Sequence, residues 1–331
     1  MRNEAIDILK GIGITLVLVA HSLGGFVSQF AYTFHMPLFF IVAGLFIAEA
    51  DSTISFYSWW KKVAKKDFKR LLLPAVFTTG VILSIYSLLW LNGIVASSPL
   101  SLIWDDKPDR LFANIIMPGN LWFLFALFFT RQAFYVMRKI CSTPVLPFAC
   151  LAIGALAVIV GKYIALPFCI LVSISVLPFV WGGYLLKHRG GPDKGIPHWF
   201  YLSVPIWGVY IFYGELRVGE MQYSWGYIPD IVAACGGTLF FYWVSKILST
   251  KTRYTRQIFS FLGTYSLILI CVPGIETYCF PMQEIIPAMP YRFVFVILGK
   301  VAWCVLAVYI CLKISFLRNI FGVHKAQKLK R

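Results

Sequence analysis

Residues 1–45 read MRNEAIDILKGIGITLVLVAHSLGGFVSQFAYTFHMPLFFIVAGL, and this stretch decides the fold. It contains two apolar segments, each close to the roughly 20 residues that a helix needs to cross a bilayer. Asp7, Lys10 and His21 lie in the first segment, and His35 lies near the start of the second. A titratable side chain at membrane depth is costly, so it usually has a partner or a function. We therefore predict that these two helices hold the functional site.

The composition places most of the chain in lipid. Hydrophobic residues make up 59% of the 331 residues and charged residues only 13%, and the mean hydropathy is +0.76. A soluble domain carries about 25% charged residues. The net charge of +16 does not indicate a nucleic-acid partner, because the basic residues cluster between apolar segments. We expect an all-α integral membrane protein with a lipid bilayer as its surroundings.

The apolar segments predict about ten transmembrane helices in a single domain over residues 1–331. No soluble domain, internal repeat or low-complexity linker is evident. The basic stretch 314–331 is expected to be a cytoplasmic tail along anionic lipid head groups. The expected spans are 6–25, 31–49, 71–92, 112–136, 144–161, 165–186, 198–214, 227–246, 258–275 and 293–313.

The loops between these segments predict the orientation. Lysine and arginine are concentrated in alternate loops, most densely in residues 61–70. Cytoplasmic loops of membrane proteins carry this excess of positive charge. The pattern favours an even number of spans with both termini in the cytoplasm. We expect a multi-pass protein of the cell's inner (cytoplasmic) membrane.

Lys10 and His21 share one face of the first helix. They are eleven residues apart, which is close to three full turns and about 16 Å along the axis. Asp7 precedes Lys10 by three residues, where the two side chains can pair. An imidazole titrates near neutral pH and can take a proton from a hydroxyl. The alternative is a hydrogen-bonded core histidine with ordinary interfacial charges below it.

His35 is expected at the start of the second helix, because Pro37 suits a first helical turn. The connection from about Gly24 to Ala31 is short, so His35 and His21 should lie on the same side of the membrane. A capping or interfacial histidine is the alternative for His35.

Five segments resemble the acyltransferase family 3 membrane proteins, and the likeness is greatest to the branch of sugar O-acetyltransferases related to fucose acetylases. Lys10 and His21 have the spacing of the basic residue and the histidine in that family's first helix. The other segments resemble its later motifs, and together they extend over most of the chain. The five segments are 6–22 (IDILKGIGITLVLVAHS), 34–44 (FHMPLFFIVAG), 70–74 (RLLLP), 121–124 (LWFL) and 261–267 (FLGTYSL).

Two departures from the family pattern stand out. Many members carry a pair of arginines before the third helix, whereas Lys69 and Arg70 stand here. Many members also carry a histidine shortly after the late Ser-Leu pair, and residues 268–276 contain none.

The resemblance implies transfer of an acyl group, usually acetyl, from acyl-CoA to a hydroxyl of a carbohydrate acceptor. The donor, acetyl-CoA or another acyl-CoA, is then a substrate, and no metal is expected. His21 and His35 would be catalytic, with His21 as general base or transient acyl carrier and His35 orienting the acceptor or stabilising the oxyanion. The basic residues near the cytoplasm, Lys10, Lys69 and Arg70, would bind the polyanionic donor.

Asp7, Trp122 and Ser266 are expected to support this site, although packing between helices is the simpler explanation for Trp122. Glu276 and Glu284 are expected in an outer loop, where solvated carboxylates are common. Two other functions also suit the sequence. One is a multi-pass transporter or flippase of a glycan or small molecule, and the other is a catalytically inactive relative.

Overall fold

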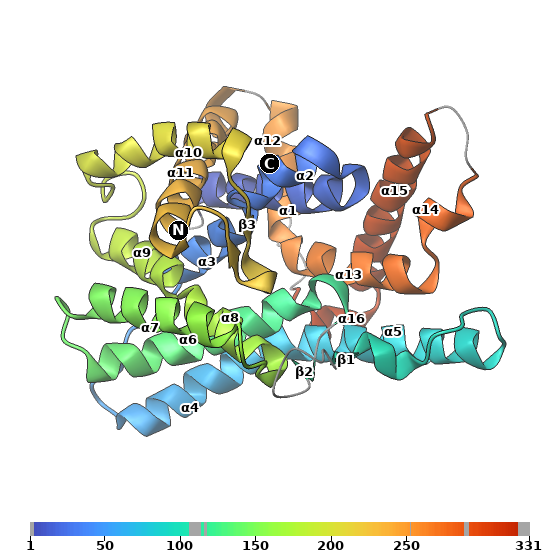
Figure 1. Cartoon of the computed structure of the whole chain (residues 1–331), viewed down its shortest axis with the longest axis horizontal. Coiled ribbons are helices and arrows are strands. Elements are labelled where there is room, and N and C mark those ends of the chain that lie inside the picture. The colour runs from blue at the N-terminus through green and yellow to red at the C-terminus, as the bar shows by residue number, and fades with distance from the viewer. Residues whose placement is uncertain (1–2, 106–113, 116–117, 252, 288–290, 324–331) are drawn as a thin grey trace.

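The computed structural model describes residues 3–105, 114–115, 118–251, 253–287 and 291–323, and the chain is built almost entirely of helices there (Figure 1). Two pairs of two-residue strands, β1–β2 and β3–β4, are antiparallel. The longer helices are α1 Glu4–Leu23, α3 His35–Leu45, α4 Phe56–Asp67, α5 Leu73–Leu91, α6 Trp122–Ile140, α7 Leu146–Val160, α9 Leu177–His188, α10 Ser203–Tyr213, α11 Tyr227–Lys251, α12 Arg253–Thr264, α13 Ser266–Cys279 and α15 Arg292–Lys313. The shorter elements are α2 Gly25–Tyr32, α8 Ile170–Ser175, α14 Met282–Ile285, α16 Ser315–Ile320, β1 Trp104–Asp105, β2 Asn114–Ile115, β3 Leu216–Arg217 and β4 Gln222–Tyr223, with π- or 3-10-helical turns at Phe68–Leu72, Pro99–Leu102, Gly119–Leu121, Pro167–Cys169, His198–Leu202 and Val218–Glu220.

The described part of the chain contains five helices that are long and apolar enough to cross a membrane, or seven if two bent pairs each count as one span. The helices α8 and α9 form one pair, bent by 55°, and α12 and α13 form the other, bent by 72°. Helical residues lie in each of the ten predicted segments. The all-α class is confirmed, and the number of ten spans and the orientation of the termini stay predictions. The end of the predicted tail, 324–331, lies outside the described residues.

Two predicted boundaries are wrong. The fourth span was expected from residue 112, but α6 begins at Trp122, after β2 and a 3-10 turn. The connection after Gly24 is not a simple loop, since it forms the helix α2. Gly24 has φ +64°, a left-handed conformation that glycine adopts without strain, and this lets the chain turn sharply from α1 into α2.

Glycines of the quoted motifs lie where helix backbones touch. A Cβ atom at Gly263 of α12 would lie 1.7 Å from the Asp7 carbonyl oxygen of α1. A Cβ atom at Gly44 of α3 would lie 2.2 Å from the Val180 carbonyl oxygen of α9. Small residues let membrane helices approach this closely. These contacts fix α1 on α12 and α3 on α9.

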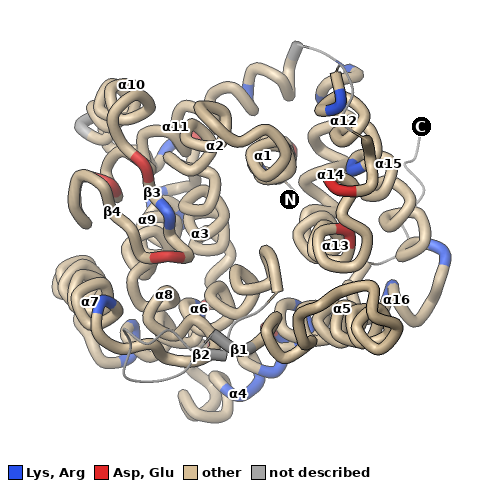
Figure 2. The backbone as a smooth tube through the Cα atoms, turned by 45° about the vertical axis from the view of Figure 1, so that its right-hand side comes forward, with Lys and Arg blue, Asp and Glu red and all other residues tan. Residues whose placement is uncertain are grey.

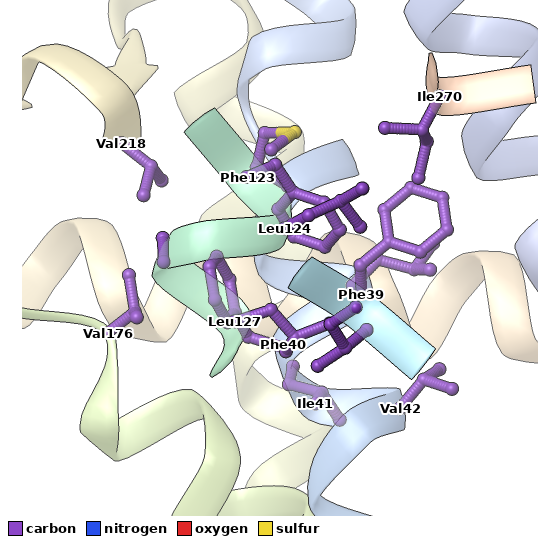
Figure 3. Packing of buried hydrophobic residues seen from close by; sticks show 14 of the residues in the cluster. Phe39, Phe40, Ile41, Val42, Phe123, Leu124, Leu127, Val176, Val218 and Ile270 are labelled. Carbon is purple, nitrogen blue, oxygen red and sulfur yellow. The ribbon is translucent and has the colours of Figure 1, made fainter. Parts of the chain in front are cut away.

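The aromatic side chains of α3 pack on α6 in the middle of the molecule (Figure 3). The Phe123 ring of α6 lies 5.7 Å from the Phe39 ring and 5.2 Å from the Phe40 ring, measured between centroids. All three rings are buried. In Figure 2, α1, α7, α10 and α13 are seen end-on, so these helices run roughly parallel. The first two helices of the sequence are thereby held inside a larger bundle.

Candidate functional site

Both predicted histidines lie at one end of the bundle, on either side of a tyrosine. The Tyr32 ring of α2 lies 6.3 Å from the His21 ring and 5.1 Å from the His35 ring, edge to face in both cases. His21 is exposed, whereas His35 is buried. The prediction that the two residues share a side of the protein fits this arrangement. An accessible imidazole can exchange protons with a bound molecule, and a buried one is better suited to positioning.

The position of His35 is fixed by its own helix turn. Its Nδ1 atom lies 2.5 Å from the Ala31 carbonyl oxygen. A carbonyl oxygen only accepts hydrogen bonds, so Nδ1 carries the hydrogen atom. In the neutral ring the lone pair is therefore on Nε2. His35 also begins α3, as the Pro37 signal predicted.

Three residues outside the predicted site complete the surroundings of His21. The Asn120 side chain lies within hydrogen-bonding reach of the His21 imidazole, and the Lys300 ammonium group acts on it electrostatically. Lys300 pairs with Glu276 at 3.5 Å. Only 2% of the Glu276 side chain is exposed, and its Oε1 atom accepts a hydrogen bond from the Met282 amide. We call His21, Tyr32, His35, Asn120 and Lys300 the histidine end.

The expectation for Glu276 was therefore wrong. It lies inside α13 and not in a solvated loop. The helix includes Pro273 and continues to Cys279, beyond the predicted end of the span at residue 275. Lys300 is a lone cation inside the apolar run of α15, a signal for function that the sequence did contain. Asn120 carries no distinguishing signal other than its place beside the Leu121-Trp122 pair.

A hairpin from the second half of the chain lies beside the histidine end. Arg217 of β3 lies over the Tyr32 ring, with its Cζ atom 5.8 Å from the ring centroid. Its hydrogen bond and ion pair with Glu215, at 2.7 Å, raise the pKa of Arg217 above its usual value, so it stays cationic. Trp122 packs against Gly219 of the same hairpin, because a Cβ atom there would lie 2.9 Å from the indole ring. Trp122 thus borders the histidine end.

The other predicted residues of the first helix lie farther away. Lys10 pairs with Asp7 at 2.7 Å, as predicted from their spacing. Both residues lie three or more turns of α1 away from His21. Ser266 begins α13 and donates a hydrogen bond to the Gly263 carbonyl oxygen at 3.0 Å, across the bend between α12 and α13. The observed contact of the Ser266 side chain is therefore with the backbone of the preceding turn.

A second polar cluster lies deeper along α6, about 16 Å from Asn120 at the rise of a helix. Arg131 donates hydrogen bonds to the Asp67 carboxylate at 2.9 Å, to the Ala43 carbonyl oxygen at 3.2 Å and to the Tyr135 hydroxyl at 2.8 Å. Gln132 adds a hydrogen bond to Asp67 at 3.2 Å. We call Asp67, Arg70, Arg131, Gln132 and Tyr135 the arginine end.

Lys69 and Arg70 lie on a π-helical turn, Phe68–Leu72, which joins α4 to α5. Such turns often mark functional positions. Both side chains are exposed, and Arg70 is close enough to Arg131 and Asp67 for their charges to interact. The structure thus places the Asp67–Arg131 ion pair beside the predicted basic pair. Lys10 takes part in none of the contacts given above for this cluster in the described part of the chain.

Chemically, the two ends differ in what they can do. The histidine end offers an accessible imidazole, a buried imidazole and an ammonium group, which suits proton transfer at a hydroxyl and stabilisation of a developing negative charge. The arginine end offers exposed cations beside a buried hydrogen-bonded network, which suits an anion. These features suit proton transfer at the histidine end and binding of an anion at the arginine end.

Comparison with known proteins identifies the class more closely. Residues 3–309 match the family described as acyltransferase domain, family 3. The match extends over nearly the whole chain, so the protein belongs to this family and is a multi-pass membrane acyltransferase. No curated protein and no solved structure gives a significant match.

Proposed function

We propose that the protein is an O-acyltransferase of the sugar O-acetylase-like branch, which moves an acetyl group from acetyl-CoA to a hydroxyl of a cell-envelope or exported sugar. The observation that carries this proposal is the histidine end: an accessible His21 beside Tyr32, His35 and Lys300. In this proposal, the chain lies in the inner membrane with both termini in the cytoplasm.

His21 serves as the general base. It takes the proton of the acceptor hydroxyl while the oxygen attacks the thioester carbonyl carbon, and the carbon–sulfur bond breaks. The proton then passes to the departing sulfur, so that the products are an ester and free CoA. A positioned base of this kind contributes about 10²- to 10⁴-fold in rate. Asn120 orients the imidazole, and Lys300 stabilises the negative charge that develops on the carbonyl oxygen.

His35 and Tyr32 position the acceptor. The Nδ1 hydrogen bond of His35 to Ala31 fixes its ring, and an Nε2 lone pair can then accept a hydrogen bond from a sugar hydroxyl. The Trp122 ring and the Tyr32 ring provide flat apolar faces near the same place, of the kind that cover a sugar ring. Arg217 adds a cation to this wall.

The donor enters from the arginine end. Acyl-CoA is polyanionic, and exposed Lys69 and Arg70 provide positive charge there. The pantetheine arm then extends along α6 towards His21. Lys10, held by Asp7, adds positive charge on α1.

The test is release of free thiol from acetyl-CoA by the protein in lipid nanodiscs, with and without a cell-envelope glycan extract. We expect glycan-stimulated release by the wild type and by His198→Ala, whose histidine is exposed and lies outside the histidine end. His21→Ala should lose this release and still insert and fold. Normal release by His21→Ala would remove His21 from the mechanism. Failure of the wild type to bind or consume any acyl-CoA would favour a transporter or an inactive relative.

A further inference from the structure

A groove of about 530 Å³ lies beside the histidine end, between α1, α12 and α15, with α13 as its floor. These four helices lie next to one another at one side of the bundle (Figure 2). The groove follows α1 from Thr15 to Ser22 and includes Phe261, Leu269, Lys300 and Val305 in its walls. We call it the α1–α15 groove. Of the residues that line it, the mechanism above uses only Lys300.

Apart from Gln257 and Lys300, the residues that line this groove present apolar surface, even where they carry a hydroxyl. Thr15 donates its hydroxyl hydrogen to the Gly11 carbonyl oxygen and Ser22 donates its own to the Leu18 carbonyl oxygen, both at 2.8 Å within α1. Their polar atoms are therefore engaged within the helix. A sugar or a CoA phosphate placed in the groove away from Lys300 and Gln257 would lose its hydrogen bonds to water without replacement. The space suits a hydrocarbon chain.

The groove opens on a face that is itself apolar. Among its lining residues, Ile258 is 58% exposed, Val301 is 49% exposed and Val305 is 61% exposed. The helix α15 is the candidate span with the least burial, 22% of its most apolar window. In a membrane this face meets lipid tails, so a chain can enter the groove sideways from the bilayer.

One charged residue lines the groove, and it is also the one that acts on His21. Lys300 has three N–H donors, and Glu276 is its ion-pair partner, at 3.5 Å. Its ammonium group therefore has hydrogen atoms available for an anionic group. An amphiphile whose chain lies in the groove would bring such a head group to Lys300, whose charge acts on His21. Ser22, which follows His21 in α1, lines the same groove.

We propose that the α1–α15 groove binds the hydrocarbon chain of the acceptor, and that the acceptor is a sugar joined to a membrane lipid through a phosphate group. The phosphate lies at Lys300 and the sugar extends over Tyr32 towards Arg217. This inference rests on the proposed function, which it deepens by naming the acceptor class. Because the chain anchors the acceptor, a free sugar in water should be a poor substrate.

Binding is tested first, without reference to activity. The probe is an alkyl phosphate with a photoreactive group on its chain, incorporated into nanodiscs with the protein, and mass spectrometry locates the labelled residues. We expect labelling of the α1 and α15 groove residues. Val301→Trp, which fills the groove, should reduce it at least tenfold, whereas Leu298→Trp on the exposed face of α15 outside the groove should leave it unchanged. Equal labelling of both variants would overturn the groove as a binding site.

The charge requirement is tested with an uncharged alkyl glycoside carrying the same photoreactive chain. The phosphate probe should label the groove more strongly than the glycoside. The preference should disappear in the double variant Lys300→Met/Glu276→Gln, which removes both charges together and leaves no buried ion unpaired. Equal labelling of the wild type by both probes would show bilayer lipid filling the groove and would overturn the phosphate assignment.

Activity then distinguishes this inference from the proposed function. Thiol release from acetyl-CoA is measured with lipid-linked glycans extracted in organic solvent and with the same glycans freed from lipid. We expect stimulation by the lipid-linked form only, with a loss of at least tenfold in Val301→Trp and less than twofold in Leu298→Trp. Equal stimulation by the free glycan would overturn the lipid-linked acceptor while leaving the acyltransferase intact. No release with either form would count against the proposed function, and the labelling result would still decide the groove.

Discussion

The histidine end and the arginine end are both polar clusters within an apolar bundle, yet their polar groups are arranged differently. At the arginine end, Arg131 reaches three acceptors on three separate parts of the chain, Asp67, Ala43 and Tyr135. At the histidine end, His21 is exposed. Its neighbours are the Tyr32 ring, in an edge contact, and the side-chain amide of Asn120. Most polar groups of the arginine end are engaged by protein, with the buried Gln132 Oε1 atom as an exception. The histidine end leaves room for a ligand beside the exposed His21.

Stability and chemistry therefore reside in different parts of the molecule. A buried hydrogen-bonded network ties helices together, and removing one member of its ion pair leaves the other charged and unpaired. An accessible imidazole contributes little to folding and is free to exchange a proton. The exposed Lys69 and Arg70 lie at the margin of this network, where a donor can bind without disturbing the Asp67–Arg131 ion pair.

The largest expected effect comes from the histidine end. His21→Ala should lower acyl transfer by about 10²- to 10⁴-fold, since the general base is removed. Its melting temperature should match that of the wild type, because the side chain is exposed. Thiol release and thermal unfolding are measured on the same preparation. A large drop in melting temperature would show that His21 stabilises the fold. The histidine end and the arginine end would then not differ in their contribution to stability.

The arginine end should respond in the opposite way. Arg131→Met leaves the buried Asp67 carboxylate without its ion-pair partner, and breaking such a pair costs about 3–5 kcal/mol. Denaturant titration in mixed micelles measures the free energy of unfolding. The double variant Asp67→Asn/Arg131→Met should recover a large part of the loss, since no charge remains buried. Equal losses in the single and double variants would argue against the ion pair as the cause.

A smaller effect is expected where α1 is held against α12. Gly263→Ala would place a methyl group 1.7 Å from the Asp7 carbonyl oxygen, so the helices must move apart, at a cost of about 1–3 kcal/mol. Gly182→Ala is the matched control, because no atom lies within 4 Å of its added methyl group. The control should be neutral or stabilising, by up to about 1 kcal/mol. Unchanged stability in Gly263→Ala would show that this contact does not fix α1.

The smallest effect is expected at an exposed ion cluster that joins α3 to α6 and α9. Glu49 pairs with Lys187 at 2.5 Å and with Arg138 at 3.0 Å. Burial opposes ionisation there, but the hydrogen bond from Lys187 and the charge of Arg138 lower the pKa of Glu49 below its usual 4.5. The cluster therefore stabilises the fold above about pH 4.5 and loses this contribution as the pH falls through the lowered value.

Glu49→Gln should lower stability at neutral pH by less than about 1 kcal/mol, because the pair is solvated. The difference between variant and wild type should vanish in acid, as followed by melting temperature against pH. A difference that grew towards low pH would contradict the sign of the pKa shift. Comparing the loss of stability in Glu49→Gln with that in Arg131→Met shows how much burial increases the contribution of an ion pair to stability.

Some of these features were predictable from the sequence and others were not. Helical spacing placed Asp7 against Lys10 and His35 at the start of a helix, because both depend on neighbours within one or two turns. Spacing within one segment cannot show that Lys300 and Glu276 lie beside His21, since their helices α15 and α13 come from the far end of the chain. Spacing within one segment also gives no partner for Arg131, which the structure places in a network with Asp67.

The number of spans was harder to predict for a different reason. Hydropathy identifies apolar segments, but it does not reveal the bends of 55° and 72° between α8 and α9 and between α12 and α13. Whether a bent pair counts as one crossing depends on the neighbouring helices. The glycine contacts could not be predicted for the same reason. Gly44 and Gly263 were recognised as parts of motifs, but only the packing of the helices shows which backbones they touch.

The most direct test of the central claim measures acyl transfer per folded molecule for His21→Ala and Arg131→Met in parallel, using radiolabelled acetyl-CoA and a cell-envelope glycan extract in nanodiscs. Folded protein is quantified by size-exclusion chromatography of the same samples. The account predicts that His21→Ala is as abundant as the wild type and inactive, and that Arg131→Met is scarce, with the surviving molecules retaining acyl transfer. An active His21→Ala protein, or an abundant Arg131→Met protein that is inactive, would contradict it.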